Sequence, residues 1–497
     1  MSLTQELWDI KEHIREVAQG YGLDFFETIF EVVDYKKINE LAAYGGFPTR
    51  YPHWRYGMEY EQLSKSAEYG LSKIYEMVIN NNPSYAYLLE GNNLVDQKTV
   101  IAHVYAHVDF FKNNYYFSKT NRKMIDAMAN HATRVRRYID LLGIEQVESF
   151  VDVCLSIENL IDYNSPFIER KYKDEGADDL EPADGVGRFE AKDYMESYIN
   201  PESFLEAQRQ KAALEQERAK RFPAHPHRDI MGFLLEHAPL DAWENDVLGI
   251  VRDEAYYFAP QGQTKIMNEG WASFWHSRIL TQAPVLDDSE IVDFADINSR
   301  VMQTSRGQLN PYKLGVELFR DIERRWDMGR FGKQWEDEQR LEARDEWDLK
   351  LGLGTEKIFE VRKLYNDISF IDAFLTEDFA RRNKMFSYIF NKRSGSWEIE
   401  SREFATIKQR LLDQLTNFGQ PFIFVKDGNY RNRSELLLHH KFYDVELRVD
   451  YARGVLEALQ RIWKRPVNIE TMIEGQGVLW HYDGKAHSER SVRYEHL

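Results

Sequence analysis

The sequence predicts a mainly α-helical N-terminal body followed by a smaller C-terminal α+β domain. Apolar residues recur at helical spacing through most of the chain before residue 395. Beyond that point a helical segment is followed by short β-rich runs and a second helix, the runs being Pro421–Val425, Glu435–His440 and Val467–Thr471. A chain of 497 residues is long enough for roughly two to four domains of ordinary size.

The composition excludes several classes of protein. The net charge of −18 argues against general binding to nucleic acid or to anionic lipid, because both require positive patches. Cys154 is the single cysteine, so neither an intrachain disulfide nor a thiolate-rich zinc site is possible. The first residues contain no basic region followed by an apolar run, and no apolar run elsewhere reaches 18 residues, so we expect neither a leader peptide nor a membrane span. We therefore expect a cytoplasmic protein, and the oligomeric state stays open.

Changes in periodicity suggest four regions. Residues 1–169 form a helical region that carries a histidine pair. Residues 170–228 comprise an acidic loop, a charged helix and a proline-containing connector. Residues 229–394 form a second helical region with an Asn-Glu-Gly-Trp-Ala segment, and residues 395–497 form the α+β domain.

The first helical region contains the pattern most typical of a metal site. Residues 4–43 show helical stripes, the second of which runs through Phe25, Ile29 and Val32. A later helix, which starts near Asp96, places His103 and His107 four residues apart on one face. Two imidazoles at this spacing can converge on one ion.

Other ionisable residues interrupt apolar stripes at positions that helical periodicity predicts to be buried. His131 does so in a helix at about 121–142, Glu158 in one at about 147–162, and Glu254 in one that begins near Asp241. His131 taken alone is more typical of a hydrogen-bonded core residue. All of them need partners, because a buried unpaired charge is costly.

The segment Ile266–His276 is the one around which the chain is organised. As a helix it places Glu269, Ser273 and His276 on one side, among large aromatic residues. A carboxylate and an imidazole then share a partly desolvated wall.

The simplest way to satisfy these buried groups is a divalent metal held between helices. Zinc suits mixed imidazole and carboxylate ligands best, and iron or manganese would also be accepted. The candidate ligands are His103, His107, Glu269, His276, His131 and Glu158. The alternative is a metal-free network of histidine–glutamate hydrogen bonds and ion pairs.

Long motifs resemble those of the stage V sporulation protein R family. The matching segments are His103–Asn114, Phe233–Leu240, Lys265–His276, Asn310–Gly315 and Phe319–Glu323. The resemblance extends over nearly the whole chain. It implies a role in forming the spore cortex, the modified peptidoglycan layer of endospores, and it implies no particular biochemical activity.

A second resemblance concerns the chemistry. Asn268–Ala272 is similar to the Asn-Glu-Gly-Phe-Ala segment of zinc aminopeptidases, which implies that Glu269 is a third zinc ligand beside His103 and His107. Val104 stands where those peptidases have their catalytic glutamate. A hydrolase would therefore need another general base, and Glu254 and Asp109 are the candidates.

These observations lead to two hypotheses. The first is a metal-dependent hydrolase, similar to a peptidase or amidase, that acts on a peptidoglycan-related or peptide substrate in cortex formation. The second is a non-enzymatic assembly or regulatory factor that acts through protein partners.

Overall fold

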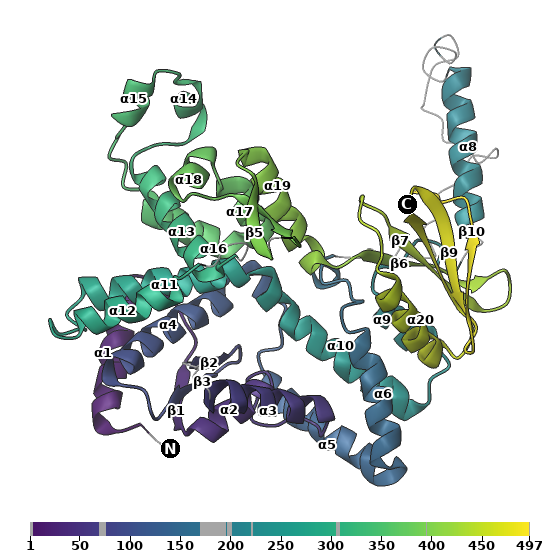
Figure 1. Ribbon diagram of the computed structural model, residues 1–497, viewed down its shortest axis with the longest axis horizontal. Coiled ribbons are helices and arrows are strands. Elements are labelled where there is room, and N and C mark those ends of the chain that lie inside the picture. The colour runs from purple at the N-terminus through teal and green to yellow at the C-terminus, as the bar shows by residue number, and fades with distance from the viewer. Residues whose placement is uncertain are drawn as a thin grey trace. The chain divides into compact units, whose positions relative to one another are not determined.

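The computed structural model describes residues 3–68, 76–168, 195, 201–219, 222–304, 309–393 and 395–496. The chain forms two compact units, whose elements are labelled in Figure 1. The first unit contains Met1–Gly143 and Tyr257–Gly419, and the second contains Ile144–Tyr256 and Gln420–Leu497. The second unit therefore includes a segment inserted between the two halves of the first.

The first unit is mostly helical. Its longer helices are α1 (Gln5–Gly20), α2 (Tyr35–Ala43), α3 (Trp54–Glu68), α4 (Leu94–Asn113), α5 (Met124–Leu142), α11 (Lys265–Gln282), α12 (Ile291–Val301), α13 (Pro311–Asp327), α16 (Gly354–Leu364), α17 (Asp367–Phe374) and α19 (Phe404–Leu415). Its shorter helices are η1 (Tyr115–Phe117), α14 (Gly332–Asp337), α15 (Leu341–Asp345), α18 (Glu377–Arg382) and η3 (Thr416–Gly419).

A small three-stranded sheet lies within this helical unit. Its strands β1 (Thr28–Val33), β2 (Glu76–Ile79) and β3 (Ser84–Leu89) have the order β1-β3-β2, with β1 parallel and β2 antiparallel to β3. The helical stripe predicted through Phe25, Ile29 and Val32 is therefore wrong. Thr28–Val33 contains Thr, Ile, Phe and two Val, and such β-branched and aromatic residues suit a strand that is buried in a sheet.

Helices α4 and α11 form the centre of the first unit and pack side by side (Figure 1). On α4, every residue from Val95 to Phe111 is buried, so polar side chains on any face of this helix lie inside the protein. The Asn93 side chain caps the helix by accepting a hydrogen bond from the Asp96 amide. On α11, residues Ile266–Ser277 are likewise buried.

Two features fix the position of α11. Asp367, at the start of α17, accepts hydrogen bonds from the amides of Ile266 and Met267 at 2.8 and 2.9 Å, and so satisfies donors that the first turn of a helix leaves open. Gly270 of α11 and Gly315 of α13 also face each other at backbone contact. A Cβ atom built on Gly270 would lie 2.4 Å from the Gly315 Cα. The two helices therefore meet as closely as their main chains allow.

A two-stranded hairpin completes the first unit. Strands β4 (Ser387–Asn391) and β5 (Ser396–Ser401) pair antiparallel, with Tyr388 opposite Ile399 and Phe390 opposite Trp397. Opposite residues lie on the same face of a sheet, so these four apolar side chains share one face of the hairpin.

The second unit combines helices with a five-stranded sheet. Its helices are α6 (Ile144–Ser156), η2 (Ser165–Phe167), α8 (Glu202–Ala219), α9 (Ile230–His237), most of α10 (Ala242–Gln263) and α20 (Val449–Trp463). The sheet has the order β10-β9-β8-β7-β6, with strands β6 (Phe422–Tyr430), β7 (Glu435–Lys441), β8 (Val467–Ile473), β9 (Gln476–Tyr482) and β10 (His487–Ser491). Strands β7 and β8 are parallel, and α20 connects them.

This architecture confirms the predicted fold class, a mainly helical N-terminal body with a smaller C-terminal α+β region. The charged helix predicted near residues 201–220 is α8. The acidic loop predicted at 170–187 lies outside the described residues, and the four predicted region boundaries stay predictions. Among the helices that the structure describes, none is both long and apolar enough to cross a membrane.

Buried histidine in the sheet gives a prediction about pH. His440 of β7 is 3% exposed, and its Nδ1 lies 2.9 Å from the Thr471 hydroxyl. Burial, aided by the neighbouring His439, lowers the pKa of His440 to about 4. The unfolded chain binds a proton near pH 6.5 and the folded chain does not, so stability present above pH 6.5 is lost between pH 6.5 and 4. This loss amounts to about 3 kcal/mol.

We expect His440→Gln to flatten the pH dependence of unfolding between pH 6.5 and 4, as measured by denaturant titration at several pH values. His225→Gln, at an exposed position of the same unit, is the matched control and should leave the profile unchanged. Equal profiles for the wild type and His440→Gln would contradict the prediction.

Candidate metal centre

The histidine pair lies in the middle of α4. Asn93 starts the helix and fixes its phase, so His103 and His107 fall one turn apart on the same face. Both side chains are buried, with exposed fractions of 5% and 4%. Their ring centroids are 4.5 Å apart. Two imidazoles thus enter the core side by side.

Glu269 of α11 meets this pair. Its side chain is also buried, and its Oε2 atom lies 3.7 Å from His103 Nε2 and 3.5 Å from His107 Nε2. One donor atom from each of the three residues lies within 4.8 Å of the other two. Within the described residues, this is the group of His, Cys, Asp and Glu side chains that has the geometry of a metal site.

These distances fit a divalent ion. Zinc binds imidazole nitrogen and carboxylate oxygen at about 2.0–2.2 Å, so two ligands of a tetrahedral site are about 3.4 Å apart. The two nitrogen–oxygen separations are close to that value. Three protein ligands would leave one position of a tetrahedron open, as in catalytic rather than structural zinc sites.

Residues behind the histidines orient their rings. His107 Nδ1 lies 2.9 Å from the side-chain oxygen of Asn268. An amide oxygen only accepts hydrogen bonds, so Nδ1 carries the proton and the Nε2 lone pair faces Glu269. His103 Nδ1 lies 2.7 Å from His276 Nδ1, an arrangement in which one ring donates to the other. When His103 donates, its Nε2 also becomes a ligand atom.

The charge on Glu269 is stabilised by its neighbours. Burial by itself would raise the pKa of this carboxyl group. The neighbouring imidazoles of His103 and His107, together with the positive charge of Lys265, outweigh burial and hold the pKa of Glu269 well below its usual value. Lys265 Nζ lies 3.0 Å from Oε1, the oxygen that is not directed at the histidines. Glu269 therefore presents an ionised Oε2 to the pair.

Aromatic rings enclose the group. Tyr312 of α13 stacks on His103 with a ring-centroid distance of 6.3 Å, and Phe111 stacks on His107 at 6.0 Å. Phe294 of α12 meets His276 edge-on at 5.9 Å. These apolar walls lower the local dielectric constant and so strengthen the interactions between charged groups in the site.

Asp109 has a different environment from the three ligand candidates. Its carboxylate accepts hydrogen bonds from Arg362 Nη1 at 2.9 Å, the Trp271 indole at 2.8 Å and the Asp24 amide at 2.8 Å. Burial raises the pKa of Asp109 to about 6, against the opposing effect of Arg362. These contacts join α4, α11 and α16, which gives Asp109 a role in holding the helices together.

The other predicted site residues lie outside the group of three. His276 contacts His103 from behind, and His131 is buried on α5 of the same unit. Glu254 is buried on α10 as predicted, and it belongs to the second unit. Glu158 also belongs to the second unit. It lies half-buried in a turn, because α6 ends at Ser156 and the helix predicted to residue 162 is too long.

Sequence reasoning missed three residues of the site. Asn268, Lys265 and Tyr312 each contact a ligand candidate. Asn268 and Lys265 stand in the same short segment as Glu269, within reach of its helix face, so proximity in sequence could have indicated them. Tyr312 follows Asn310-Pro311, a helix start, and nothing in that pattern indicates contact with His103.

Comparison with known proteins identifies the family of the chain. The sequence profile described as SpoVR-like protein matches residues 2–420, more than four fifths of the chain. The chain belongs to the SpoVR family. Family membership supports a sporulation-related role, which the resemblance also implied. The match covers all the residues of the metal-site candidate and ends just before β6 begins at Phe422.

One curated relative of this SpoVR-family chain is the "Uncharacterized protein YcgB" of Escherichia coli (strain K12). The two are 29% identical over 505 residues, which cover 93% of this chain and 91% of the relative. No solved structure matches.

The residue behind His107 gives a prediction. Asn268→Ala removes the acceptor that fixes the ring and its tautomer, and the loss of such an outer partner typically lowers metal affinity by about 10–100-fold. We expect that weakening for zinc, measured by competition with a chromogenic chelator. Asn121→Ala, in the turn before α5, is the matched control and should bind zinc as the wild type does. Unchanged affinity in Asn268→Ala would show that Asn268 does not orient the ring.

Proposed function

We propose that this SpoVR-family protein is a metal-dependent hydrolase that acts in the cytoplasm on a peptidoglycan-related or peptide substrate during spore cortex formation. The observation that carries the proposal is the convergence of His103, His107 and Glu269 from two helices that are far apart in sequence. Family membership supports the link to sporulation.

The donor set favours zinc, and iron or manganese would also fit two imidazoles and a carboxylate. An ion held there would acidify a bound water molecule and polarise a carbonyl group. The protein supplies the rest. Glu269 and the two histidines hold the ion, Asn268 and His276 orient the rings, and Tyr312 helps to exclude bulk water.

Asp109, one of the two candidate general bases, is engaged by other groups. Asp109 Oδ1 accepts hydrogen bonds from the Asp24 amide and Arg362, and Asp109 Oδ2 accepts them from the Trp271 indole and Arg362. A carboxylate whose lone pairs are engaged by buried donors is poorly placed to take a proton from water. We therefore propose a structural role for Asp109, and Glu254, which belongs to the second unit, stays a candidate base from the sequence alone.

Metal analysis of the full-length protein tests the proposal. We expect about one zinc, iron or manganese ion per chain, a lower unfolding temperature after chelation, and recovery when the ion is restored. Hydrolysis is then assayed on muropeptides and on unstructured peptides, with the chelated protein as the inactive control.

The rival hypothesis, a non-enzymatic assembly factor, predicts a different result. A protein that contains no metal, gains no stability from added zinc, iron or manganese, and hydrolyses neither substrate would overturn the hydrolase proposal and favour action through protein partners.

A further inference from the structure

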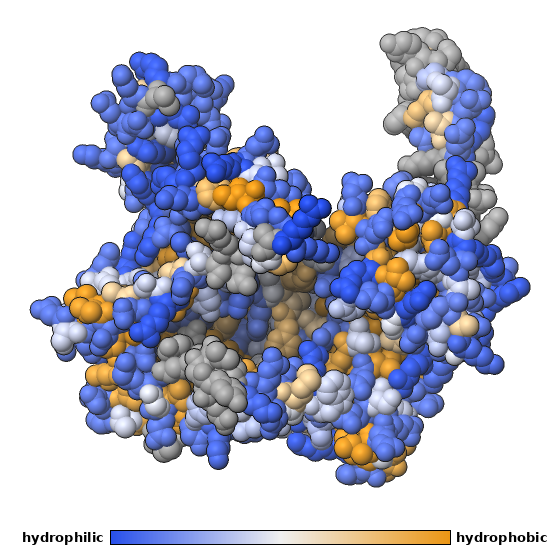
Figure 2. Space-filling view, in the orientation of Figure 1, coloured by the Kyte–Doolittle hydropathy of each residue, from blue (hydrophilic) through white to orange (hydrophobic). Residues whose placement is uncertain are grey.

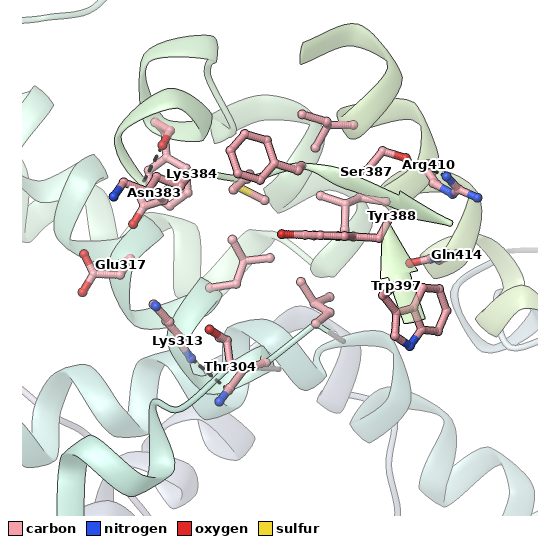
Figure 3. Close-up of a pocket in the computed structure, with 18 residues that line it drawn as sticks. Thr304, Lys313, Glu317, Asn383, Lys384, Ser387, Tyr388, Trp397, Arg410 and Gln414 are labelled. Atoms are coloured by element: carbon pink, nitrogen blue, oxygen red, sulfur yellow. Dashed lines mark hydrogen bonds between the residues drawn. The ribbon is translucent and has the colours of Figure 1, made fainter. Parts of the chain in front are cut away.

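A cavity of about 360 Å³ lies in the first unit, away from the three candidate ligands (Figure 3). It is formed by the start of α13, the residues before β4, the β4–β5 hairpin and α19. This volume is at the lower end of the range typical of small-molecule sites. No part of the function proposed above accounts for it.

The walls of the cavity combine aromatic and aliphatic side chains with polar ones. Tyr388 and Trp397, from the shared face of the hairpin, line it together with Phe386 and the side chains of Leu314 and Ile407. Trp397 keeps 41% of its surface exposed, although an indole of this size is usually more deeply buried. In Figure 3, Tyr388 extends across the cavity, with Trp397 at one end. Flat rings on this scale suit a planar or apolar ligand body.

Hydrophobic residues continue outside the cavity. Phe390 and Ile399, on the same face of the hairpin, are 46% and 43% exposed. Figure 2 shows apolar surface over the region of β5 and α19.

Cationic side chains outnumber carboxylates in the lining of the cavity, in contrast to the chain as a whole. Arg410 pairs with Glu400 and donates to Ser387 at 2.6 Å, and Glu317 pairs with Arg320 at 2.9 Å. Two cations remain, Lys313 on α13 and Lys384 before β4, and neither has a carboxylate within ion-pair distance among the described residues.

Lys313 is better placed than Lys384 to bind a negative group in the cavity. It is half-buried, and it lies on the first turn of α13 beside the aromatic wall, whereas Lys384 is exposed at the rim. A protein of net charge −18 offers many carboxylates that could have paired with these lysines. Two cations without a carboxylate partner beside an aromatic wall favour a ligand that carries a negative charge of its own.

We propose that this cavity binds a small organic anion, with the negative group held by Lys313 and Lys384 and an apolar or aromatic body held against Tyr388 and Trp397. The negative group of this ligand would be a carboxylate, phosphate or sulfonate. Its ring would bury apolar surface against the aromatic wall. The site is separate from the proposed hydrolase chemistry, although Tyr312, next to Lys313, stacks on His103.

A pair of fluorescent probes with the same ring system tests this proposal. 1-Anilinonaphthalene-8-sulfonate carries a sulfonate, and N-phenyl-1-naphthylamine is its uncharged counterpart. We expect the full-length protein to bind one sulfonate probe per chain at this site, more tightly than the neutral probe, with an affinity that falls as salt is added.

Substitutions in the protein distinguish the contribution of the charged group to binding from that of the ring. Lys313→Gln should weaken the sulfonate probe by about tenfold or more and leave the neutral probe unchanged, because only a charge-assisted contact is lost. Trp397→Ala should weaken both probes. Lys333→Gln, at an exposed lysine of the same unit, is the control and should change neither. Circular dichroism melting verifies that each variant is folded.

Two results would overturn the proposal. One is equal affinity of Lys313→Gln and the wild type for the sulfonate probe. The other is equal affinity of the wild type for the two probes. His103→Ala should retain the sulfonate probe with unchanged affinity, so failure of the metal proposal and failure of this one are distinguishable.

Discussion

Glu269→Gln is expected to lower zinc affinity by about 100-fold or more, which corresponds to about 2.7 kcal/mol. The substitution keeps the size of the side chain but replaces the ionised Oε2, which lies 3.7 and 3.5 Å from the two histidine Nε2 atoms, with a neutral amide. A metal site that is left with two imidazoles loses both a ligand and the negative charge that offsets the ion. Isothermal titration of chelator-treated protein with zinc measures the change.

Glu356→Gln provides the matched control. Glu356 is exposed on α16 of the same unit, so its replacement changes the net charge of the protein equally without altering the site. If Glu269→Gln and Glu356→Gln bound zinc with the same affinity, the ion would not be held by Glu269. Loss of binding in His107→Ala together with retention in Glu269→Gln would point to a different third ligand.

Gly315→Ala is expected to destabilise the protein by about 3 kcal/mol or more, beyond the usual effect of adding a methyl group to a core. The new Cβ atom would lie 2.2 Å from the Ile266 carbonyl oxygen and 2.6 Å from the Gly270 Cα. These are backbone atoms, so no side-chain rotation relieves the contact. Helices α11 and α13 must move apart, and Glu269 and Tyr312 move with them.

The stability of Gly315→Ala is measured by thermal and denaturant unfolding of the metal-free protein, monitored by circular dichroism. Gly57→Ala is the control, since a Cβ atom on Gly57 of α3 would meet nothing within 4 Å. Alanine at such an exposed helical position stabilises by up to about 1 kcal/mol. We therefore expect Gly315→Ala to lower the free energy of unfolding and Gly57→Ala to raise it. Equal changes would show that the close α11–α13 contact does not limit stability.

Helical periodicity carried most of the fold prediction, because long segments with apolar residues at helical spacing, such as α5 and α4, have few alternatives. It failed at β1, where a six-residue strand in a three-stranded sheet leaves no signal distinct from a short helix. Its pairing with β3 joins residues more than fifty positions apart, a contact that local sequence does not encode.

The candidate site, like the fold, was predicted in part from the sequence. The spacing of His103 and His107 and the aromatic setting of Glu269 indicated three residues that the structure brings together. Burial alone could not separate His131, Glu158 and Glu254 from them, because a buried polar residue can find its partners anywhere in the fold. Only the packing of α4 on α11 makes that distinction.

The insertion of the second unit between the halves of the first has a consequence for biosynthesis. Helix α4 leaves the ribosome before α11 has been translated, with the segment Ile144–Tyr256 still to come. At ordinary rates of translation the delay is roughly ten seconds or more. Throughout this time α4 can pack against α1, β2 and β3, which precede it, but the face that the finished protein covers with α11 stays without that partner until the second half of the chain emerges.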